Sequence, residues 1–587
     1  MSSPRPTPEP VRIEPARGTR LWCIALLLLV VAHVSLGLDC ARRWSVTHDE
    51  FWHLPAGLAA WREGRFDVDN LNPPLTRLWD ALPLAIGGAV LPAGLPADDA
   101  FILGDRFLSA NSAEYHNWYA WARSFNLMLS AATGVLLAVW GRRSFGPASG
   151  LAAAGLWLLC PITLSSGALV TPDSGGALLF CATLFALSEH ARNPRLPAAL
   201  AAGLLLGLAQ LTKFTNVLLF PAVPLVWCVL RWRSELPRAG AGRVLTHAIA
   251  ASAVALLAWN AGYLFHETPR SLDQFEFRSL QVQRLVGAIG PLARCPVPIP
   301  ADYLRGFDRQ RAIMEGSHPV YLDGVWSLQG FPNYYVYAAG YKLPHATQAW
   351  LLFGLLTSLV KRGRQSWRIN AVLLGVAVSL IAVASGVGMQ LGIRYILPAF
   401  PLLYLFASQA AQAVFDLRAR WGKPIVALGI LALASGLRYH PRHIAYFNEV
   451  SGGLAQGRNH LADSNLDWGQ DLRELREYLE TQQIEQIGLA YFGMFPPSAL
   501  GFDYSIPPRA AQVAAIGRPP AGWYAVSVNF VLGRPHTIRA PDNSIERTGY
   551  QEFGYFRRYQ PVVTIGGSID VYHIEVPRRP RTSVPGQ

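Results

Sequence analysis

Long apolar runs recur along the first three quarters of this sequence and are separated from one another by charged residues, proline or glycine. A helix needs about 20 mostly apolar residues to cross the hydrocarbon core of a bilayer. Hydrophobic residues make up 51% of the chain, charged residues only 15%, and the mean hydropathy is +0.22. These values indicate a polytopic α-helical membrane protein rather than a set of soluble domains. We predict about eleven spans from apolar content and length, at residues 21–38, 121–140, 148–168, 175–188, 196–211, 217–230, 245–265, 347–360, 369–387, 395–415 and 424–437.

The loops between these runs fix the predicted orientation. If the N-terminus is inside, the cytoplasmic loops are 141–147, 189–195, 231–243, 361–368 and 416–423, and each of them contains at least two Arg or Lys residues. Cytoplasmic loops of membrane proteins carry such an excess of positive charge. One missed or extra span would move the later basic loops to the wrong side, so the agreement predicts a cytoplasmic N-terminus and an extracytoplasmic C-terminal part.

The basic net charge follows from the same loops. The chain has 51 Lys and Arg residues against 38 Asp and Glu residues, which gives a net charge of +13. A basic total can indicate nucleic-acid binding, but most of the positive charge here lies in short clusters between apolar runs. We therefore predict a membrane protein with no nucleic-acid partner.

Six cysteines show no spacing typical of a metal site. Four of them lie inside apolar runs, and only Cys40 and Cys295 are expected outside the membrane. Because the outer compartment is oxidising, these two are the pair available for a disulfide. The sequence predicts no cofactor, and it leaves a dependence on a divalent metal open.

The topology divides the chain into parts of different composition. We predict a disordered cytoplasmic tail at 1–20, a transmembrane domain at 21–438 with large external loops at 39–120 and 266–346, a small external α/β domain at 439–577, and a disordered tail at 578–587. The apolar piece at 82–97 is rich in glycine and proline. We expect an interfacial or re-entrant element there, with a spanning helix as the alternative.

The α/β character of the C-terminal part rests on two patterns. Residues 471–483 have the spacing of an amphipathic helix, because Leu472, Leu475 and Leu479 fall on one face. The stretches 487–493, 523–533 and 562–576 are rich in β-branched and aromatic residues, which predicts strands.

The first external segment opens with two adjacent carboxylates, Asp49 and Glu50, between His48 and His53. Acidic residues are common in external loops, so a solvated loop edge is the plain alternative. A carboxylate at the mouth of a membrane domain is partly desolvated, however, which raises its pKa and allows it to act as a base. The two histidines are five positions apart (53 − 48) rather than the four of a zinc-protease helix, so they do not indicate a metalloprotease.

Three further polar residues lie at the same outer ends of the predicted spans: Asp173, Lys213 and Arg394. Each one alone is explained equally well by a loop charge or by a side chain that reaches the interface from within the membrane. Together they are less ordinary, because two isolated cations stand in very short outer loops. Isolated cations at that depth suit a phosphate group held at the level of the lipid headgroups.

Several stretches between residues 47 and 479 carry a resemblance to a known superfamily. They are HDEFWHLPAGLAAWREGRF, NPPL, LVTPDS, LAQLTKFTN, GIRYILPAFPLL, YHPRHIAYFNEVSGG and LADSNLDWGQDLRELREYL. With them the chain resembles membrane glycosyltransferases of the GT-C superfamily, in the group related to protein O-mannosyltransferases and lipid A aminoarabinose transferases. The acidic pair is the hallmark of that group, and DSNLDWGQDL (463–472) is similar to a bacterial branch that depends on polyprenyl phosphate.

The resemblance implies a GT-C-like catalytic domain in a bacterial cytoplasmic (inner) membrane. It implies transfer of a hexosyl or pentosyl group, with inversion, from a polyprenyl-phosphate-linked sugar donor to a lipid, glycan or protein acceptor at the outer face. It further implies Asp49 as the catalytic base with Glu50 beside it. The residues that we assign to substrate binding are His53, Asp173, Lys213, Arg394 and Tyr395.

One position departs from the family pattern. Relatives usually carry an acid shortly before the Pro-Pro-Leu of the first loop, whereas here Asn72 precedes Pro73. The nearest acids are Asp67 and Asp69. The departure leaves a second catalytic carboxylate in this loop unassigned.

Two other interpretations remain open at the level of sequence. A transporter or flippase of a lipid-linked or small polar substrate would place charges near the middle of the membrane, often in paired repeats. A membrane-anchored binding protein would instead use the C-terminal domain, with Trp468 as a stacking platform for a carbohydrate. The residues around Trp468 also fit a helix start, with Asp467 or Ser464 as the cap.

Overall fold

The computed structural model describes residues 16–95, 99–232, 240–360, 364–416 and 422–575. The predicted tail at 578–587 and most of the predicted tail at 1–20 lie outside these ranges, although a helix already begins at Ala16. Every predicted apolar run contains a helix. The helices of this bundle are α1 (Ala16–Arg43), α5 (Tyr115–Phe145), α6 (Pro147–Leu158), α7 (Pro161–Gly167), α8 (Pro172–Arg192), α9 (Leu196–Gln210), α10 (Leu219–Arg231), α11 (Ala241–Ala261), α15 (His345–Val360), α16 (Arg364–Ser385), α17 (Ala399–Asp416) and α18 (Gly422–Arg438).

Fewer of these helices meet the length and hydropathy of a complete span. Within the described ranges, five segments do so, and the number rises to seven if each of two bent helix pairs counts as one span. The prediction of about eleven spans is larger because it counted short apolar runs as well. Helix α9, for example, has 15 residues, which rise about 22 Å at 1.5 Å per residue, less than the core of a bilayer.

The predicted run at 148–168 is one of the bent pairs. Helices α6 and α7 meet at an angle of 63°, and Cys160 between them is extended, with φ −75° and ψ 132°. Pro161 explains the break, because proline lacks an N–H and disfavours the helical conformation in the residue before it. The bend shortens α7 and brings the chain to the start of α8, where Asp173 lies in the first turn.

Helix α5 is central to the bundle and packs against α1, α6, α8, α17 and α3 (Leu75–Gly87). Small residues set the closest helix contacts elsewhere. A Cβ at Gly203 would lie 2.2 Å from the carbonyl oxygen of Ala251, and one at Gly207 would lie 2.3 Å from that of Ala255. Helices α9 and α11 therefore touch backbone to backbone, as small residues at membrane helix interfaces allow.

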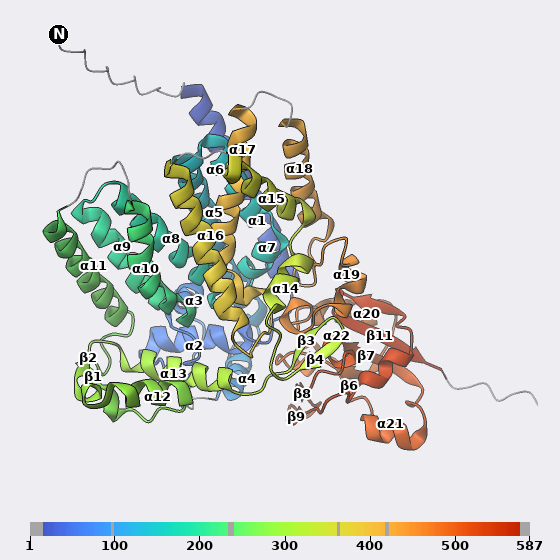
Figure 1. The fold of residues 1–587 in the computed structure, drawn as a ribbon. Coiled ribbons are helices and arrows are strands. Elements are labelled where there is room, and N and C mark those ends of the chain that lie inside the picture. Colours follow the sequence, from blue (N-terminus) through green and yellow to red (C-terminus); the bar gives the residue numbers. More distant parts are fainter. Residues whose placement is uncertain (1–15, 96–98, 233–239, 361–363, 417–421, 576–587) are drawn as a thin grey trace, which may run out of the picture.

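The three large predicted external segments gather at one end of the bundle (Figure 1). The start of α1 lies at the opposite end. The gathered elements are α2 (Glu50–Glu63) and α4 (Ala100–Ala110) from the first segment, and α12 (Leu280–Ile289), α13 (Ala301–Glu315) and α14 (Tyr334–Lys342) from the second, which also contains the strand pairs β1 (Arg270–Ser271) with β2 (Pro296–Val297) and β3 (Val320–Leu322) with β4 (Val325–Ser327).

The apolar piece predicted at 82–97 forms the second half of α3 and a loop that follows it. Helix α3 begins at Leu75, directly after Pro74, and ends before Gly88, which has a left-handed φ of 84°. Its 13 residues rise about 20 Å, too little to span a bilayer. It contacts α2 and α5 instead, while residues 96 and 97 lie outside the described ranges.

The C-terminal part forms a mixed five-stranded sheet of order β10-β11-β7-β5-β6. One predicted strand is shorter than expected, because 523–533 is extended only as far as Ser527 and then forms a helical turn. The Ser527 hydroxyl caps this turn by accepting a hydrogen bond from Asn529 N. The elements are α19 (Gly453–Gln456), α20 (Leu472–Thr481), β5 (Gln486–Ala490), β6 (Asp503–Ser505), α21 (Ala510–Ile516), β7 (Gly522–Ser527), α22 (Val528–Val531), β8 (Thr537–Arg539), β9 (Ile545–Arg547), β10 (Val563–Ile565) and β11 (Ile569–Ile574).

This C-terminal part packs directly onto the first external segment. Helix α20 buries Leu472, Leu475 and Leu479, as its spacing predicts. The apolar cluster that these leucines join also contains Phe51 and Leu54 of α2. The two segments, which are about 400 residues apart in sequence, therefore share one core.

The predicted disulfide between Cys40 and Cys295 is wrong. Both cysteines are free. Cys40 is buried at the end of α1, whereas Cys295 is exposed beside β2. A shared place on the predicted outer side of the membrane does not bring two cysteines within bonding distance.

Candidate active site

The loop between α1 and α2 is held in place by the 463–472 stretch. Ser45 N donates to Gln470 O at 2.8 Å, and His48 N donates to Trp468 O at 2.9 Å. The Ser45 hydroxyl also accepts from Arg473 N at 2.8 Å. The two stretches that carry the most specific resemblance thus lie side by side, and the second fixes the backbone that leads into Asp49.

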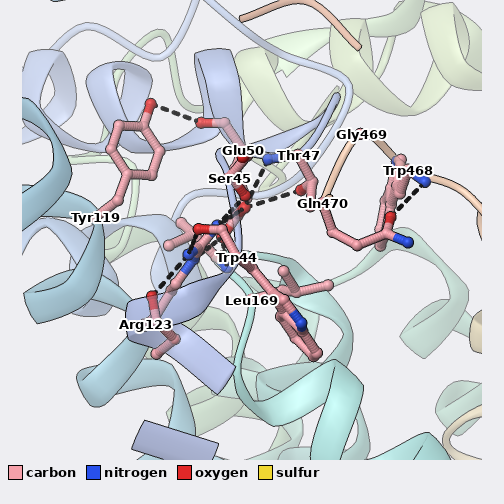
Figure 2. A network of polar contacts seen from close by, with 12 residues as sticks. Trp44, Ser45, Thr47, Glu50, Tyr119, Arg123, Leu169, Trp468, Gly469 and Gln470 are labelled. Atoms are coloured by element: carbon pink, nitrogen blue, oxygen red, sulfur yellow. Dashed lines mark hydrogen bonds and ion pairs between the residues drawn. The ribbon is translucent and has the colours of Figure 1, made fainter. Parts of the chain in front are cut away.

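Glu50 anchors this loop from within (Figure 2). Its carboxylate is fully buried and accepts from Arg123 Nε at 2.8 Å and Arg123 Nη2 at 2.6 Å. It also accepts from Thr47 N and Oγ1 and from Val170 N. The same guanidinium donates to the carbonyl oxygens of Ala41, in the last turn of α1, and of the loop residues Trp44 and Ser45. Protein donors therefore surround Glu50, and the structure separates the acidic pair into an anchor, Glu50, and a more accessible partner, Asp49.

Asp49 belongs to a chain of alternating charges that joins three predicted spans. Arg394, in a short 3₁₀ turn before α17, places Nη1 2.9 Å from Asp49 Oδ2 and 3.7 Å from Asp173 Oδ2. Lys213 Nζ donates to the other oxygen of Asp173. We call Asp49, Arg394, Asp173 and Lys213 the charge chain. Four of the seven residues predicted for the site are thus linked, each to the next, by ion pairs.

Aromatic rings hold the two cations of the charge chain. The Arg394 guanidinium carbon lies 4.0 Å from the ring centroid of Trp468. The ring of Tyr395 lies 5.4 Å from both the Arg394 guanidinium carbon and Lys213 Nζ. Cations over aromatic faces are attracted by about 0.5–2 kcal/mol. Tyr395 is therefore brought to the site as predicted from sequence, and Trp468 packs on a cation there.

Neither Asp467 nor Ser464, which the sequence offers as helix caps near Trp468, caps α20. The N-cap position of α20 is Asp471, which makes no side-chain cap hydrogen bond. The Ser464 hydroxyl donates to Leu391 O, and Asp467 accepts from Gly469 N and the Ser527 hydroxyl. Asp467 thus ties the 463–472 loop to β7, and Ser464 ties it to the segment before Arg394, so neither side chain caps the helix.

A small cavity lies beside the charge chain. Asp173, Arg394 and Trp468 line it, together with Lys342 and His443 and with apolar and hydroxyl side chains of α7 and the turns around it. It combines a carboxylate, a guanidinium, a buried lysine amine and an aromatic ring in one hollow. A guanidinium in such a hollow can bind a phosphate group through charge-assisted hydrogen bonds.

Lys342 and His443 were missed by sequence reasoning. Lys342 ends α14, is 2% exposed, and donates to the carbonyl oxygens of Ile444 and Asn465 at 2.8 and 2.5 Å. No motif marks Lys342 in the sequence. His443 lies within the quoted stretch YHPRHIAYFNEVSGG, so its position carried a signal without a role.

His53 belongs to a second buried group, one helical turn along α2 from Asp49. Its Nδ1 lies 3.0 Å from Asp69 Oδ2, and Arg77 Nη1 lies 2.9 Å from the same oxygen. Burial alone would raise the pKa of Asp69, but Arg77 and His53 lower it to about 2. Asp67 instead pairs with Arg65 in a more exposed position. Within the described ranges, His53 makes no hydrogen bond or ion pair with a member of the charge chain. It and Arg77 are instead the partners of an ionised Asp69.

The charge chain sets the protonation state of Asp49. Its side chain is 19% exposed. Burial would raise the pKa of this carboxyl, but the Arg394 guanidinium and then His48, whose Nδ1 lies 3.2 Å from Oδ1, outweigh it and hold the pKa below its usual range. Asp49 is therefore ionised, which a base requires, but its basicity is low as long as Arg394 is its partner.

Residues 119–259 match the profile of a family described as dolichyl-phosphate-mannose-protein mannosyltransferase. The chain is similar to the dolichyl-phosphate-mannose-protein mannosyltransferases. The resemblance predicted from the quoted motifs is thereby confirmed. The part of the chain that is similar to these mannosyltransferases runs from α5 into α11 and contains Arg123, Asp173 and Lys213, while Asp49 and Arg394 lie outside it.

Comparison with solved structures adds two further proteins, and a comparison with curated proteins finds no match. ArnT from Cupriavidus metallidurans is 16% identical in its apo state, with a TM-score of 0.45 over 73% of this chain and 68% of that one. Bound to undecaprenyl phosphate, it is 15% identical, with a TM-score of 0.44 over 83% and 75%. The oligosaccharyltransferase AglB from Archaeoglobus fulgidus, in complex with an inhibitory peptide and a dolichol-phosphate, is 10% identical, with a TM-score of 0.46 over 92% and 75%.

Proposed function

We propose that this chain is an integral membrane glycosyltransferase that moves a sugar from a polyprenyl-phosphate donor to an acceptor at the outer face of a bacterial cytoplasmic membrane. The observation that supports this most directly is the charge chain beside a cavity, at the end of the bundle where the three large segments gather. The similarity to the dolichyl-phosphate-mannose-protein mannosyltransferases supports the same class of reaction. The charges lie at helix ends, whereas a transporter would place them near the middle of the spans.

Asp49 is the general base in this proposal. Its carboxylate accepts the proton of the acceptor hydroxyl while the oxygen attacks the anomeric carbon of the donor sugar. The bond from that carbon to the phosphate oxygen breaks, and polyprenyl phosphate leaves with the electron pair. A hexosyl or pentosyl group is transferred with inversion at the anomeric carbon.

Arg394 and Lys213 bind the departing phosphate in this proposal. Charge-assisted hydrogen bonds from fixed cations stabilise negative charge that develops in the transition state. Because Arg394 is paired with Asp49, a phosphate that binds here competes for the same guanidinium. As the phosphate takes over that positive charge, the pKa of Asp49 rises. Donor binding thereby strengthens the base that it needs.

The proposal is tested by sugar transfer with the purified full chain. A labelled synthetic polyprenyl-phosphate sugar is offered with a panel of lipid, glycan and peptide acceptors. We expect label to appear on an acceptor together with an equal amount of released polyprenyl phosphate. Movement of the intact labelled donor across vesicle membranes, without transfer, would overturn the proposal in favour of a transporter.

We also infer about eleven membrane crossings, with the N-terminus in the cytoplasm and the C-terminal part outside. A phosphatase reporter fused after Leu437 should be active outside, and one inserted at residue 238 should be inactive there. A fusion within 266–346 is the matched control and should again report the outside. A cytoplasmic signal from the fusion after Leu437 would remove the charge chain from the outer face and with it the proposed donor site.

Loss of a proposed phosphate ligand should weaken use of the donor. We expect Arg394→Ala and Lys213→Ala to raise the apparent KM for the donor on the order of 10–100-fold, which corresponds to loss of one charge-assisted hydrogen bond of about 1.5–3 kcal/mol. Arg143→Ala is the control, because Arg143 pairs with Glu189, which lies at the opposite end of α8 from Asp173. An unchanged donor KM in both variants would assign these two cations to packing.

A further inference from the structure

A second group of reactive side chains lies outside the charge chain, at the outer end of α1. Cys40, His440 and His443 each present one ligand atom, and all of these atoms lie within 4.8 Å of one another. Cys40 is fully buried and His443 is 1% exposed. His440 is half-buried, with its side chain 22% exposed, and gives the group access to solvent.

The distances within this group fit a tetrahedral metal ion. A zinc ion with bonds of about 2.05 Å to nitrogen and about 2.3 Å to sulfur separates its ligand atoms by about 3.3 Å for two nitrogens and about 3.6 Å for nitrogen and sulfur. His440 Nδ1 lies 3.0 Å from His443 Nε2 and 3.8 Å from Cys40 Sγ. Each of these two distances is within about 0.3 Å of the tetrahedral value. A thiolate with two imidazoles is a ligand set that favours zinc.

The tautomer of His440 suits a metal, and that of His443 can change to suit one. His440 Nε2 lies 2.9 Å from Asp39 Oδ2, so this nitrogen donates its proton to the carboxylate and leaves the lone pair on Nδ1. A carboxylate behind a ligating histidine is the usual partner of such a ligand. His443 Nδ1 has no hydrogen-bond partner among the described residues. Without an ion, His443 Nε2 therefore donates its proton to His440 Nδ1, 3.0 Å away. Because Nδ1 of His443 can take up that proton, Nε2 can give it up and turn its lone pair toward the ion.

We propose that Cys40, His440 and His443 form a zinc site that ties the end of α1 to the turn after α18. Binding forms one zinc–sulfur and two zinc–nitrogen bonds, releases the thiol proton of Cys40 to solvent, and places the remaining proton of His443 on Nδ1. No oxidant or reductant takes part. Because His443 also lines the cavity beside the charge chain, the ion fixes one wall of that cavity. The inference does not depend on the sugar-transfer proposal.

Zinc binding is measured on the purified full chain after removal of metal with a chelator. Titration against a competing chromophoric chelator, followed by metal analysis, should give one zinc ion per chain for the wild type. Asp39→Asn should weaken binding by about 10–100-fold, the usual effect of losing the partner of a ligating histidine. Cys40→Ser should weaken binding more than Asp39→Asn does. Cys295→Ser, which removes an exposed free cysteine, is the control and should bind as the wild type.

A cobalt titration of the wild type keeps the test independent of how the variants fold. A thiolate–cobalt charge-transfer band should appear at one equivalent and should be missing in Cys40→Ser. Zinc should also raise the melting temperature of the wild type, but not that of Cys40→Ser. Absence of stoichiometric zinc, absence of the thiolate band, or equal zinc affinity in wild type and Cys40→Ser would overturn the site and leave a hydrogen-bonded group only.

Discussion

Asp49→Asn should lower the rate of sugar transfer by about 10²–10⁴-fold, the usual effect of losing a positioned base. Asparagine keeps the size of the side chain and can still accept a hydrogen bond from Arg394 Nη1, which lies 2.9 Å from the Asp49 carboxylate. It cannot accept the proton of the acceptor hydroxyl. The loss should therefore fall on kcat, with little change in the KM for the donor. Turnover of labelled donor under saturating conditions is the measurement.

Asp67→Asn is a matched control for this variant. Asp67 lies in the same external segment, and its partner is Arg65 rather than any member of the charge chain. Its side chain is 47% exposed, and exposed ion pairs contribute about 0–1 kcal/mol. We expect Asp67→Asn to transfer sugar at the wild-type rate. Near-normal turnover by Asp49→Asn, with both variants folded, would remove Asp49 from the role of base.

The pH profile separates a base from a merely structural carboxylate. Burial alone would raise the pKa of Asp49, and the Arg394 guanidinium and His48 reverse that effect, so that the pKa lies below its usual range. The free wild-type enzyme should thus show no loss of kcat/KM from Asp49 between about pH 5 and 9. In Arg394→Ala the guanidinium that lowers the pKa of Asp49 is gone, so burial raises this pKa. As the pH is lowered, kcat/KM of this variant should then begin to fall at a higher pH than kcat/KM of the wild type.

The local features of the fold were predictable because they depend on neighbouring residues alone. Apolar runs identify helices by content, and Leu472, Leu475 and Leu479 identify the buried face of α20 by spacing. The bend at Pro161 was not predicted, because 148–168 was counted as one span, although a proline inside a helix is a local signal for a break. The number of spans is harder to predict in this way, because the length needed to cross a bilayer is a property of the whole helix and of the turns that end it.

Half of the site could be predicted in the same manner, and the rest could not. Asp173, Lys213 and Arg394 stood out because each is an isolated charge at the outer end of an apolar run, and Asp49 because it belongs to an acidic pair after the first run. The different roles of Asp49 and Glu50 could not be predicted, because these two residues differ only in their partners. The partner of Glu50, Arg123, is 73 residues away, and the partners of Cys40 are about 400 residues away. Spacing along a chain contains no information on such contacts.

The Glu50–Arg123 pair is one of these distant contacts. Glu50→Gln should destabilise the folded chain by about 3–5 kcal/mol. Arg123 is 1% exposed, so the variant leaves a buried cation whose remaining acceptors are backbone carbonyls. Taking a charge from water into a protein is costly unless an opposite charge compensates it. Since a domain is stable by only about 5–15 kcal/mol, the change is a large share of the total.

Two further variants show whether the effect belongs to the pair. Glu63→Gln, on the same helix α2, removes a carboxylate that is 42% exposed and 3.9 Å from Arg65. It should change stability by less than about 1 kcal/mol. The double variant Glu50→Gln/Arg123→Met removes both charges and so leaves no charge unpaired. Its loss of stability should therefore be smaller than the sum of the losses of the two single variants.

The pH dependence of unfolding gives an independent check on the same pair. Burial would raise the pKa of Glu50, but Arg123 and the backbone N–H groups of Val170 and Thr47 lower it below the usual value. A carboxyl whose pKa is lower in the folded state stabilises the fold above its unfolded pKa, and this stabilisation is lost as the pH falls through the folded pKa. Thermal unfolding of the detergent-solubilised chain should therefore show a wild-type melting temperature that falls toward that of Glu50→Gln as the solution is acidified. A constant difference between the two melting temperatures at all acidic pH values, or no difference at neutral pH, would show that Glu50 does not anchor the loop by its charge.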